Sequence, residues 1–140
     1  MSIAERWRRH EKLPEEIEER LVSLPELLAS RGVRLAYLFG SLAHGKIGND
    51  VDLAILTDAD PPYRLRNDIC AWLDTERLDI VDLRRASPVL RMEVIQTGRL
   101  LYAADEAIRL DFVLETLRDY RDTAYLRQQQ ERLLRRRLTT

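Results

Sequence analysis

The sequence contains very little cysteine and lysine and has no long apolar run. Cys70 is the only cysteine among 140 residues, which excludes an internal disulfide and favours a reducing compartment. No run of about 18 apolar residues occurs, so we expect no transmembrane helix, and the first residues lack the apolar stretch of a signal peptide. The formal net charge is only −1, so whole-chain charge favours neither nucleic acid nor a membrane surface. We therefore expect a cytoplasmic protein.

The composition fits one folded domain, which the sequence pattern divides into three segments. Apolar residues make up 45% of the chain and charged residues 34%, enough for one packed core. We expect N-terminal helices over residues 1–32, a core over residues 33–104 and a helical tail over residues 105–140. Cys70 lies in an apolar helical pattern, so we expect a buried structural thiol.

Four short segments have the composition of β-strands. They are rich in branched and aromatic residues and lie at Val33–Phe39, Val51–Leu56, Leu78–Leu83 and Arg99–Ala103. The second is almost continuously apolar, which is typical of a strand that is covered on both faces. Strands that alternate with helices predict an α/β or α+β domain.

Two short helices are expected before the first strand. They cover residues 14–23 and 25–31, with Ser23 as the N-terminal cap of the second and Gly32 as the left-handed residue that ends it.

Further helices are expected at residues 63–74, at 88–98 with Ser87 as the cap, and from residue 105 onward. The last helix has an approximate apolar stripe formed by Ile108, Phe112, Leu117, Tyr120 and Ala124. We expect a break in this helix near residues 122–123.

The pair Gly40-Ser41 follows the first strand and is a candidate phosphate-binding turn. Glycine lets the backbone approach a phosphate closely, while exposed N–H groups and the serine hydroxyl can donate to its oxygens. The alternative is an ordinary strand-to-helix turn in which Ser41 caps a short helix.

Asp50 and Asp52 lie at the start of the second strand. Side chains two residues apart point to the same face of a strand, so the two carboxylates should lie together. Adjacent carboxylates repel each other unless a cation lies between them, and hard oxygen ligands suit Mg²⁺ or Mn²⁺. The alternative is a polar strand entry with solvated or arginine-paired acids.

A third acid, Asp79, lies between apolar residues of the third strand. If buried there, its carboxylate needs a partner. Asp82 is a competing candidate three residues further on, but it should face the other side of the strand, and we interpret it as structural or surface-exposed.

Together these residues resemble the signature of the nucleotidyltransferase superfamily that includes DNA polymerase β and the aminoglycoside nucleotidyltransferases. That signature is Gly-Ser, a short spacer, Asp-x-Asp, and a third Asp on a later strand. It matches Gly40-Ser41, eight intervening residues, Asp50-Val51-Asp52, and Asp79 in this sequence.

A closer resemblance is to the minimal nucleotidyltransferases, the MNT proteins paired with HEPN toxins in prokaryotic toxin–antitoxin modules. It extends from Val33 onward and rests on segments 38–45, 79–88, 98–102 and 120–126. The loop before Asp-x-Asp is shorter than is common in that family. His44 replaces a frequent arginine and Asn49 a common serine.

The resemblance implies a nucleotidyltransferase fold, with a small mixed β-sheet flanked by helices, that transfers AMP from ATP to a hydroxyl group. Gly40 and Ser41 would anchor the triphosphate, and Asp50 and Asp52 would bridge two Mg²⁺ ions. Asp79 would complete the second metal site and accept the hydroxyl proton.

The resemblance also implies a partner, a HEPN toxin whose tyrosine hydroxyl receives AMP within a hetero-oligomeric complex. The protein would then be an antitoxin that silences the toxin by AMPylation. One alternative is an antitoxin that inhibits by binding alone. Another is a nucleotidyltransferase that acts on an aminoglycoside or a similar small molecule.

The end of the tail is strongly basic. Residues 126–137 carry five arginines against the single acid Glu131. Such a helix can bind an acidic partner or nucleic acid, although no aromatic set is present for base stacking. The alternative is a solvated helix end whose arginines favour the helix dipole.

Overall fold

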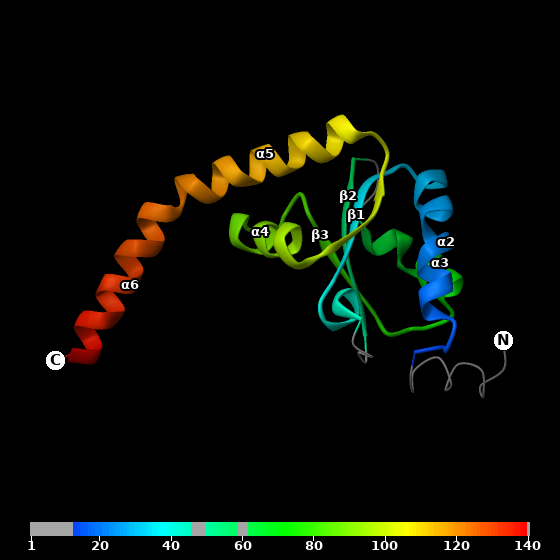
Figure 1. Ribbon diagram of the computed structural model, residues 1–140, viewed down its shortest axis with the longest axis horizontal. Coiled ribbons are helices and arrows are strands. Elements are labelled where there is room, and N and C mark those ends of the chain that lie inside the picture. Colours follow the sequence, from blue (N-terminus) through cyan, green and yellow to red (C-terminus); the bar gives the residue numbers. More distant parts are fainter. Residues whose placement is uncertain (1–12, 46–49, 59–61, 140) are drawn as a thin grey trace.

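A four-stranded mixed sheet lies at the centre of the computed structural model, which describes residues 13–45, 50–58 and 62–139 (Figure 1). The strands are β1 (Val33–Phe39), β2 (Val51–Thr57), β3 (Leu78–Asp82) and β4 (Arg99–Ala103). Their order across the sheet is β3-β2-β1-β4. β1 is antiparallel to both β2 and β4, whereas β2 and β3 are parallel. All four predicted strands are present.

Helices cover both faces of this sheet. They are α2 (Ile17–Ser30), the 3₁₀ helices η1 (Ser41–His44) and η2 (Pro62–Leu65), α3 (Arg66–Leu73), α4 (Pro88–Thr97), α5 (Glu106–Asp122) and α6 (Ala124–Thr139). α2 and α3 lie on one face, α4 and α5 lie on the other, and α6 extends away from the body (Figure 1). This confirms the predicted mixed sheet flanked by helices with a helical tail.

Alternating residues of the strands build two separate cores. Val51, Leu53 and Ile55 of β2 pack toward α2 and α3 in the larger core. Ala54 points the other way, into a smaller core that includes Tyr37 and Phe112 of α5. Because side chains alternate along a strand, Asp52 must lie on the same face as Ala54, the face toward α4 and α5.

The prediction of two short N-terminal helices is wrong, because α2 runs unbroken through Pro25. Proline removes one helical hydrogen bond. Leu21, Leu24 and Leu28 are nevertheless almost fully buried along one side of α2, and this packing offsets the loss. Ser23 is not a cap, since its hydroxyl donates to the Arg20 carbonyl at 3.1 Å and accepts from Trp72 Nε1 at 3.0 Å.

The predicted stripe of the last helix is partly wrong. Phe112 is buried, but Leu117 is 41% exposed, and the fully buried neighbour of Phe112 is Thr116. The reason is geometric: Thr116 follows Phe112 by four residues and shares its face, whereas Leu117 lies on the outer side of α5. The break near residues 122–123 is confirmed, since α5 ends at Asp122 and α6 begins at Ala124.

Other local predictions are confirmed. The Ser87 hydroxyl accepts a hydrogen bond from the Leu90 N–H at 3.2 Å and caps α4, with Pro88 in its first turn. Gly32 follows α2 with a φ of +74°. Cys70 is buried, and burial raises the pKa of its thiol. No helix in the described part of the chain is long and apolar enough to cross a membrane.

Candidate functional site

Asp52 and Asp79 lie side by side on neighbouring strands. They are register partners in the parallel pair of β2 and β3, so their Cα atoms are separated by roughly one strand spacing, about 4.8 Å. Residues in register on adjacent strands point to the same face. The sheet therefore brings together two acids that are 27 positions apart in the sequence.

Asp50 lies just before β2 and is exposed. Its charge is close enough to raise the pKa of Asp52, but it contributes less than Asp79 does. Across the described residues, no three acidic, histidine or cysteine side chains are grouped closely enough to form a complete metal site. The structure thus brings Asp52 and Asp79 together as a pair, with Asp50 at their edge.

Gly40 packs directly against the Asp52 side chain. It follows Phe39, which is the register partner of Asp52 in the antiparallel pair of β1 and β2. Its φ is +77°, a conformation that glycine adopts without strain, and a Cβ placed there would lie 2.4 Å from Asp52 Oδ2. Only a glycine leaves this space free. The predicted phosphate-binding turn at Gly40-Ser41 therefore contacts Asp52.

The remaining candidate residues are placed as follows. Ser41 begins η1, directly after Gly40, but its side chain and that of His44 lie outside the described residues, as does Asn49. The Asp82 carboxylate accepts the Arg84 N–H at 3.0 Å, and Arg84 and Arg85 lie about it at 4.0 and 3.9 Å. Asp82 thus holds the turn after β3, in agreement with its interpretation as a structural residue.

Burial and neighbouring charge act in the same direction on Asp52. Burial has the largest effect and raises the pKa of its carboxyl, and the charges of Asp79 and then Asp50 raise it further. A hydrogen bond to Asp79 also favours the protonated form. Ionising the Asp52 and Asp79 carboxyls together is therefore electrostatically unfavourable.

The burial of Asp52 and its repulsion by Asp79 predict that the stability of the metal-free protein depends on pH. The folded state holds the Asp52 proton more tightly than the unfolded state, whose pKa is near 3.8, so stability should fall as the pH rises from that value through the raised pKa. Asp52→Asn removes the charge. We therefore expect this variant to melt at a higher temperature than the wild type at neutral pH in a chelator.

Thermal melts at several pH values test this expectation. The difference between the two proteins should shrink toward about pH 3, where the carboxyl is protonated in both states. If the variant melts no higher than the wild type at neutral pH, the charged pair of Asp52 and Asp79 does not destabilise the folded protein.

A divalent cation suits this pair of acids. Carboxylate oxygens are the hard donors that Mg²⁺ and Mn²⁺ prefer, and a cation would remove the repulsion that raises the Asp52 pKa. A complete ligand set would also need the Asp50 carboxylate. The metal roles of Asp50, Asp52 and Asp79 stay a prediction.

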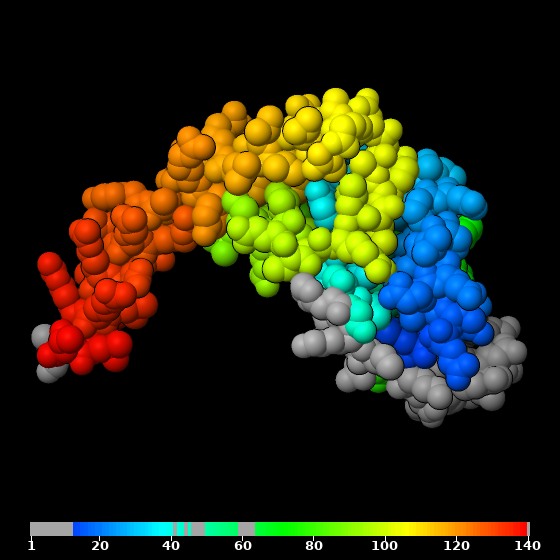
Figure 2. Space-filling model, viewed as in Figure 1, coloured from blue at the N-terminus to red at the C-terminus, as the bar shows by residue number. Residues whose placement is uncertain are grey.

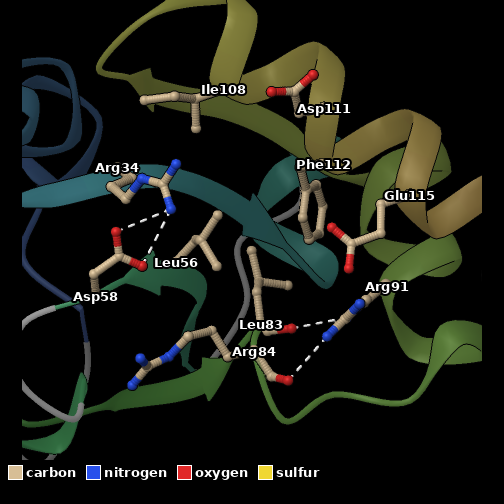
Figure 3. A pocket seen from close by; sticks show the side chains of 10 residues that line it. All are labelled: Arg34, Leu56, Asp58, Leu83, Arg84, Arg91, Ile108, Asp111, Phe112 and Glu115. Carbon is tan, nitrogen blue, oxygen red and sulfur yellow. Dashed lines mark hydrogen bonds and ion pairs between the residues drawn. The ribbon is translucent and has the colours of Figure 1, made fainter.

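A cavity of about 290 Å³ lies elsewhere on the same face of the sheet, beneath α5 (Figure 3). Its charged lining comprises Arg34, Arg84, Arg91, Asp58, Asp111 and Glu115. Leu56, four residues along β2 from Asp52, lies on its floor, so at about 3.3 Å per residue the cavity is roughly 13 Å away. None of the predicted site residues lines this cavity.

The chain is similar to proteins that carry out nucleotidyl transfer. The protein adenylyltransferase MntA of Shewanella oneidensis is 33% identical over 94 residues, which cover 63% of this chain and just under two thirds, 66%, of that relative.

Solved structures extend this similarity to the fold. A chain of a toxin–antitoxin complex with AMP-PNP superposes with a TM-score of 0.66 at 29% identity, covering 84% of this chain and 97% of that chain. A chain of the tri-AMPylated Shewanella oneidensis HEPN toxin in complex with MNT antitoxin superposes with a TM-score of 0.65 at 28% identity, covering 84% and 98%.

A family match covers the sheet and the acids. Residues 23–107, more than half of the chain, match the family described as polymerase beta, nucleotidyltransferase. This range includes all four strands, the Gly40 turn and the acidic pair. The chain belongs to the polymerase beta nucleotidyltransferase family.

Proposed function

We propose that this chain transfers AMP from ATP to a hydroxyl group, a tyrosine, of a partner HEPN toxin and thereby acts as its antitoxin. The observation that carries the proposal is the in-register pair of Asp52 and Asp79 beside Gly40. The adenylyltransferase relative, and the similar chains from complexes with AMP-PNP and with an AMPylated toxin, support the choice of nucleotide and acceptor.

The transfer exchanges one phosphorus–oxygen bond for another. The toxin hydroxyl oxygen bonds to the α-phosphorus, the bond from that phosphorus to the oxygen bridging to the β-phosphate breaks, and pyrophosphate leaves. The hydroxyl proton passes to a carboxylate, and Asp79, more exposed than Asp52, is our assignment for that base. The reaction thus needs a held triphosphate and a base on the same surface.

The turn after β1 holds the triphosphate in this proposal. Gly40 lets the backbone approach the β- and γ-phosphates without a side chain in the way, and the Ser41 hydroxyl donates to them. Asp50 and Asp52 would hold two Mg²⁺ ions, and Asp79 would complete the second ligand set. Bound Mg²⁺ supplies charge that stabilises the negative oxygens and makes the acceptor hydroxyl more acidic.

A second function, inhibition of the toxin by binding alone, is favoured by one observation. Asp50, Asp52 and Asp79 do not form a complete metal site within the described residues. A protein whose acids never close around a cation would mask the toxin without modifying it.

One labelling experiment separates the two functions. The protein is incubated with purified toxin, Mg²⁺ and ATP labelled at either the α- or the γ-phosphate. AMP transfer predicts that only the α-label reaches the toxin and that a chelator prevents it. Transfer of the γ-label would indicate phosphorylation instead. A stable complex that carries neither label would establish masking and contradict the proposed transfer.

A further inference from the structure

Helices α5 and α6 form an arm, residues 106–139, that leaves the body of the molecule (Figures 1 and 2). α5 is attached through Phe112 and Thr116, which are its buried residues. α6 has no buried residue along its 16 positions. An isolated helix of this length is only marginally stable in water, so α6 is expected to gain much of its stability from a surface that it covers.

The outer side of α5 is apolar although its inner side already packs on the sheet. Leu110, Leu114 and Leu117 are exposed and follow one another at helical spacing. They lie on the side opposite Phe112. α5 therefore has two apolar faces, of which the body covers one.

α6 continues this pattern with a stripe of its own. Its exposed leucines are Leu126, Leu133, Leu134 and Leu138. Their spacing places them on one side of the helix, and the last is 85% exposed. Apolar side chains gathered in this way on a projecting helix are typical of a protein–protein contact.

The charge of α6 narrows the choice of partner. The helix carries five arginines and one glutamate, and that glutamate is paired with Arg135 at 2.8 Å. Two copies of α6 packed together would bring ten arginines close to one another, which disfavours pairing with a second copy. A partner that fits would offer an apolar groove bordered by acidic side chains.

The arm is also bent back toward the end of the sheet at which η1 and the Gly40 turn lie (Figure 1). It curves so that the end of α6 returns to the level of η1, which follows the Gly40 turn (Figure 1). The space-filling view shows an open hollow between α6 and the body (Figure 2). A protein held by α6 would lie in this hollow, beside the body that carries the acids.

We propose that the leucine stripe and arginines of α6 are the docking surface for the acceptor toxin, recognised through an apolar groove with an acidic border. The name of the partner rests on the proposed function. The contact itself rests on the exposed stripe, the charge and the shape of the arm. α6 thus raises the local concentration of the acceptor and leaves the chemistry to the sheet.

Two full-length variants test the docking surface. One combines Leu133→Ser with Leu134→Ser, and the other combines Arg132→Glu with Arg135→Glu. Matched controls off the arm are Val22→Ser, 77% exposed on α2, and Arg85→Glu, whose side chain is 86% exposed. Since none of these side chains is buried, all four proteins should fold and melt like the wild type.

Calorimetric titration of purified toxin into each protein is the measurement. Loss of two central apolar contacts should weaken binding by about tenfold to a hundredfold, and the arginine reversals should weaken it mainly at low salt. The controls should bind like the wild type. AMP transfer should need more toxin for half-maximal rate, with an unchanged rate at saturation.

The titration measures toxin binding whether or not AMP is transferred. The proposed AMP transfer and the proposed docking surface can therefore be contradicted independently of each other. A wild-type protein that binds toxin but never modifies it contradicts the proposed function alone. Arm variants that bind toxin as tightly as the wild type overturn the docking proposal. So does a wild-type dimer that the leucine variant converts to a monomer, or RNA binding that the arginine variant alone abolishes.

Discussion

Replacing Asp52 with asparagine is expected to reduce AMP transfer by at least about a hundredfold, the scale of removing one preorganised electrostatic group from an active site. Asp52 is the acid that touches both Gly40 and Asp79, so both the triphosphate turn and the proposed metal ligands depend on it. Asparagine keeps the shape but removes the charge that would hold a cation. The rate of α-label transfer to the toxin is the measurement.

Melting curves give an independent readout of the same variant. For the wild type, Mg²⁺ with ATP should raise the melting temperature, because a ligand that binds only the folded state stabilises it. Asp52→Asn should lose most of this increase, even though its metal-free form is expected to melt higher. Loss of transfer with an undiminished increase would place the metal elsewhere.

Asp82→Asn is the matched control for the loss of a carboxylate. Asp82 lies at the end of β3, three residues after Asp79, where its carboxylate accepts the Arg84 N–H. Asparagine can accept the same hydrogen bond. Transfer should therefore stay within about twofold of the wild type. If Asp82→Asn lost as much activity as Asp52→Asn, Asp82 rather than Asp79 would be the acid of β3 that belongs to the site.

Gly40→Ala is expected to have the second largest effect. The new Cβ would lie 2.4 Å from Asp52 Oδ2, so the carboxylate must turn away. Because that side chain is short and can rotate, the contact itself should cost little stability. A displacement of about 1 Å can nevertheless lower catalysis about a hundredfold. We expect a loss of transfer near that size.

Gly32→Ala separates this contact from backbone strain. Gly32 has nearly the same φ as Gly40, +74° against +77°, but nothing lies within 4 Å of its added Cβ. Each alanine should therefore cost about 1–2 kcal/mol of stability through the left-handed backbone alone. Both variants should melt a few degrees lower, and Gly40→Ala alone should lose transfer. Equal transfer by the two variants would rule out the Gly40–Asp52 contact as a functional one.

The residue pattern of a short segment was enough to predict those structural features that depend on that segment alone. The apolar run after Asp50 predicts a strand, and the Ser87-Pro88 pair predicts the start of α4; the structure has both features. That Asp50 and Asp52 share one face stays a prediction, because β2 begins only at Val51. The N-terminal region was misjudged because Pro25 is a local signal, whereas the unbroken helix depends on leucines that pack against the sheet.

The sequence by itself determined the four strands, the glycine turn and the chemical nature of the acids, since these depend on residue type and short-range spacing. Only the tertiary structure decided that β3 lies next to β2 in a register that pairs Asp79 with Asp52, and that Gly40 touches Asp52. It also decided which leucines of the arm face outward. Such distances depend on how remote segments pack, and no local spacing contains that information.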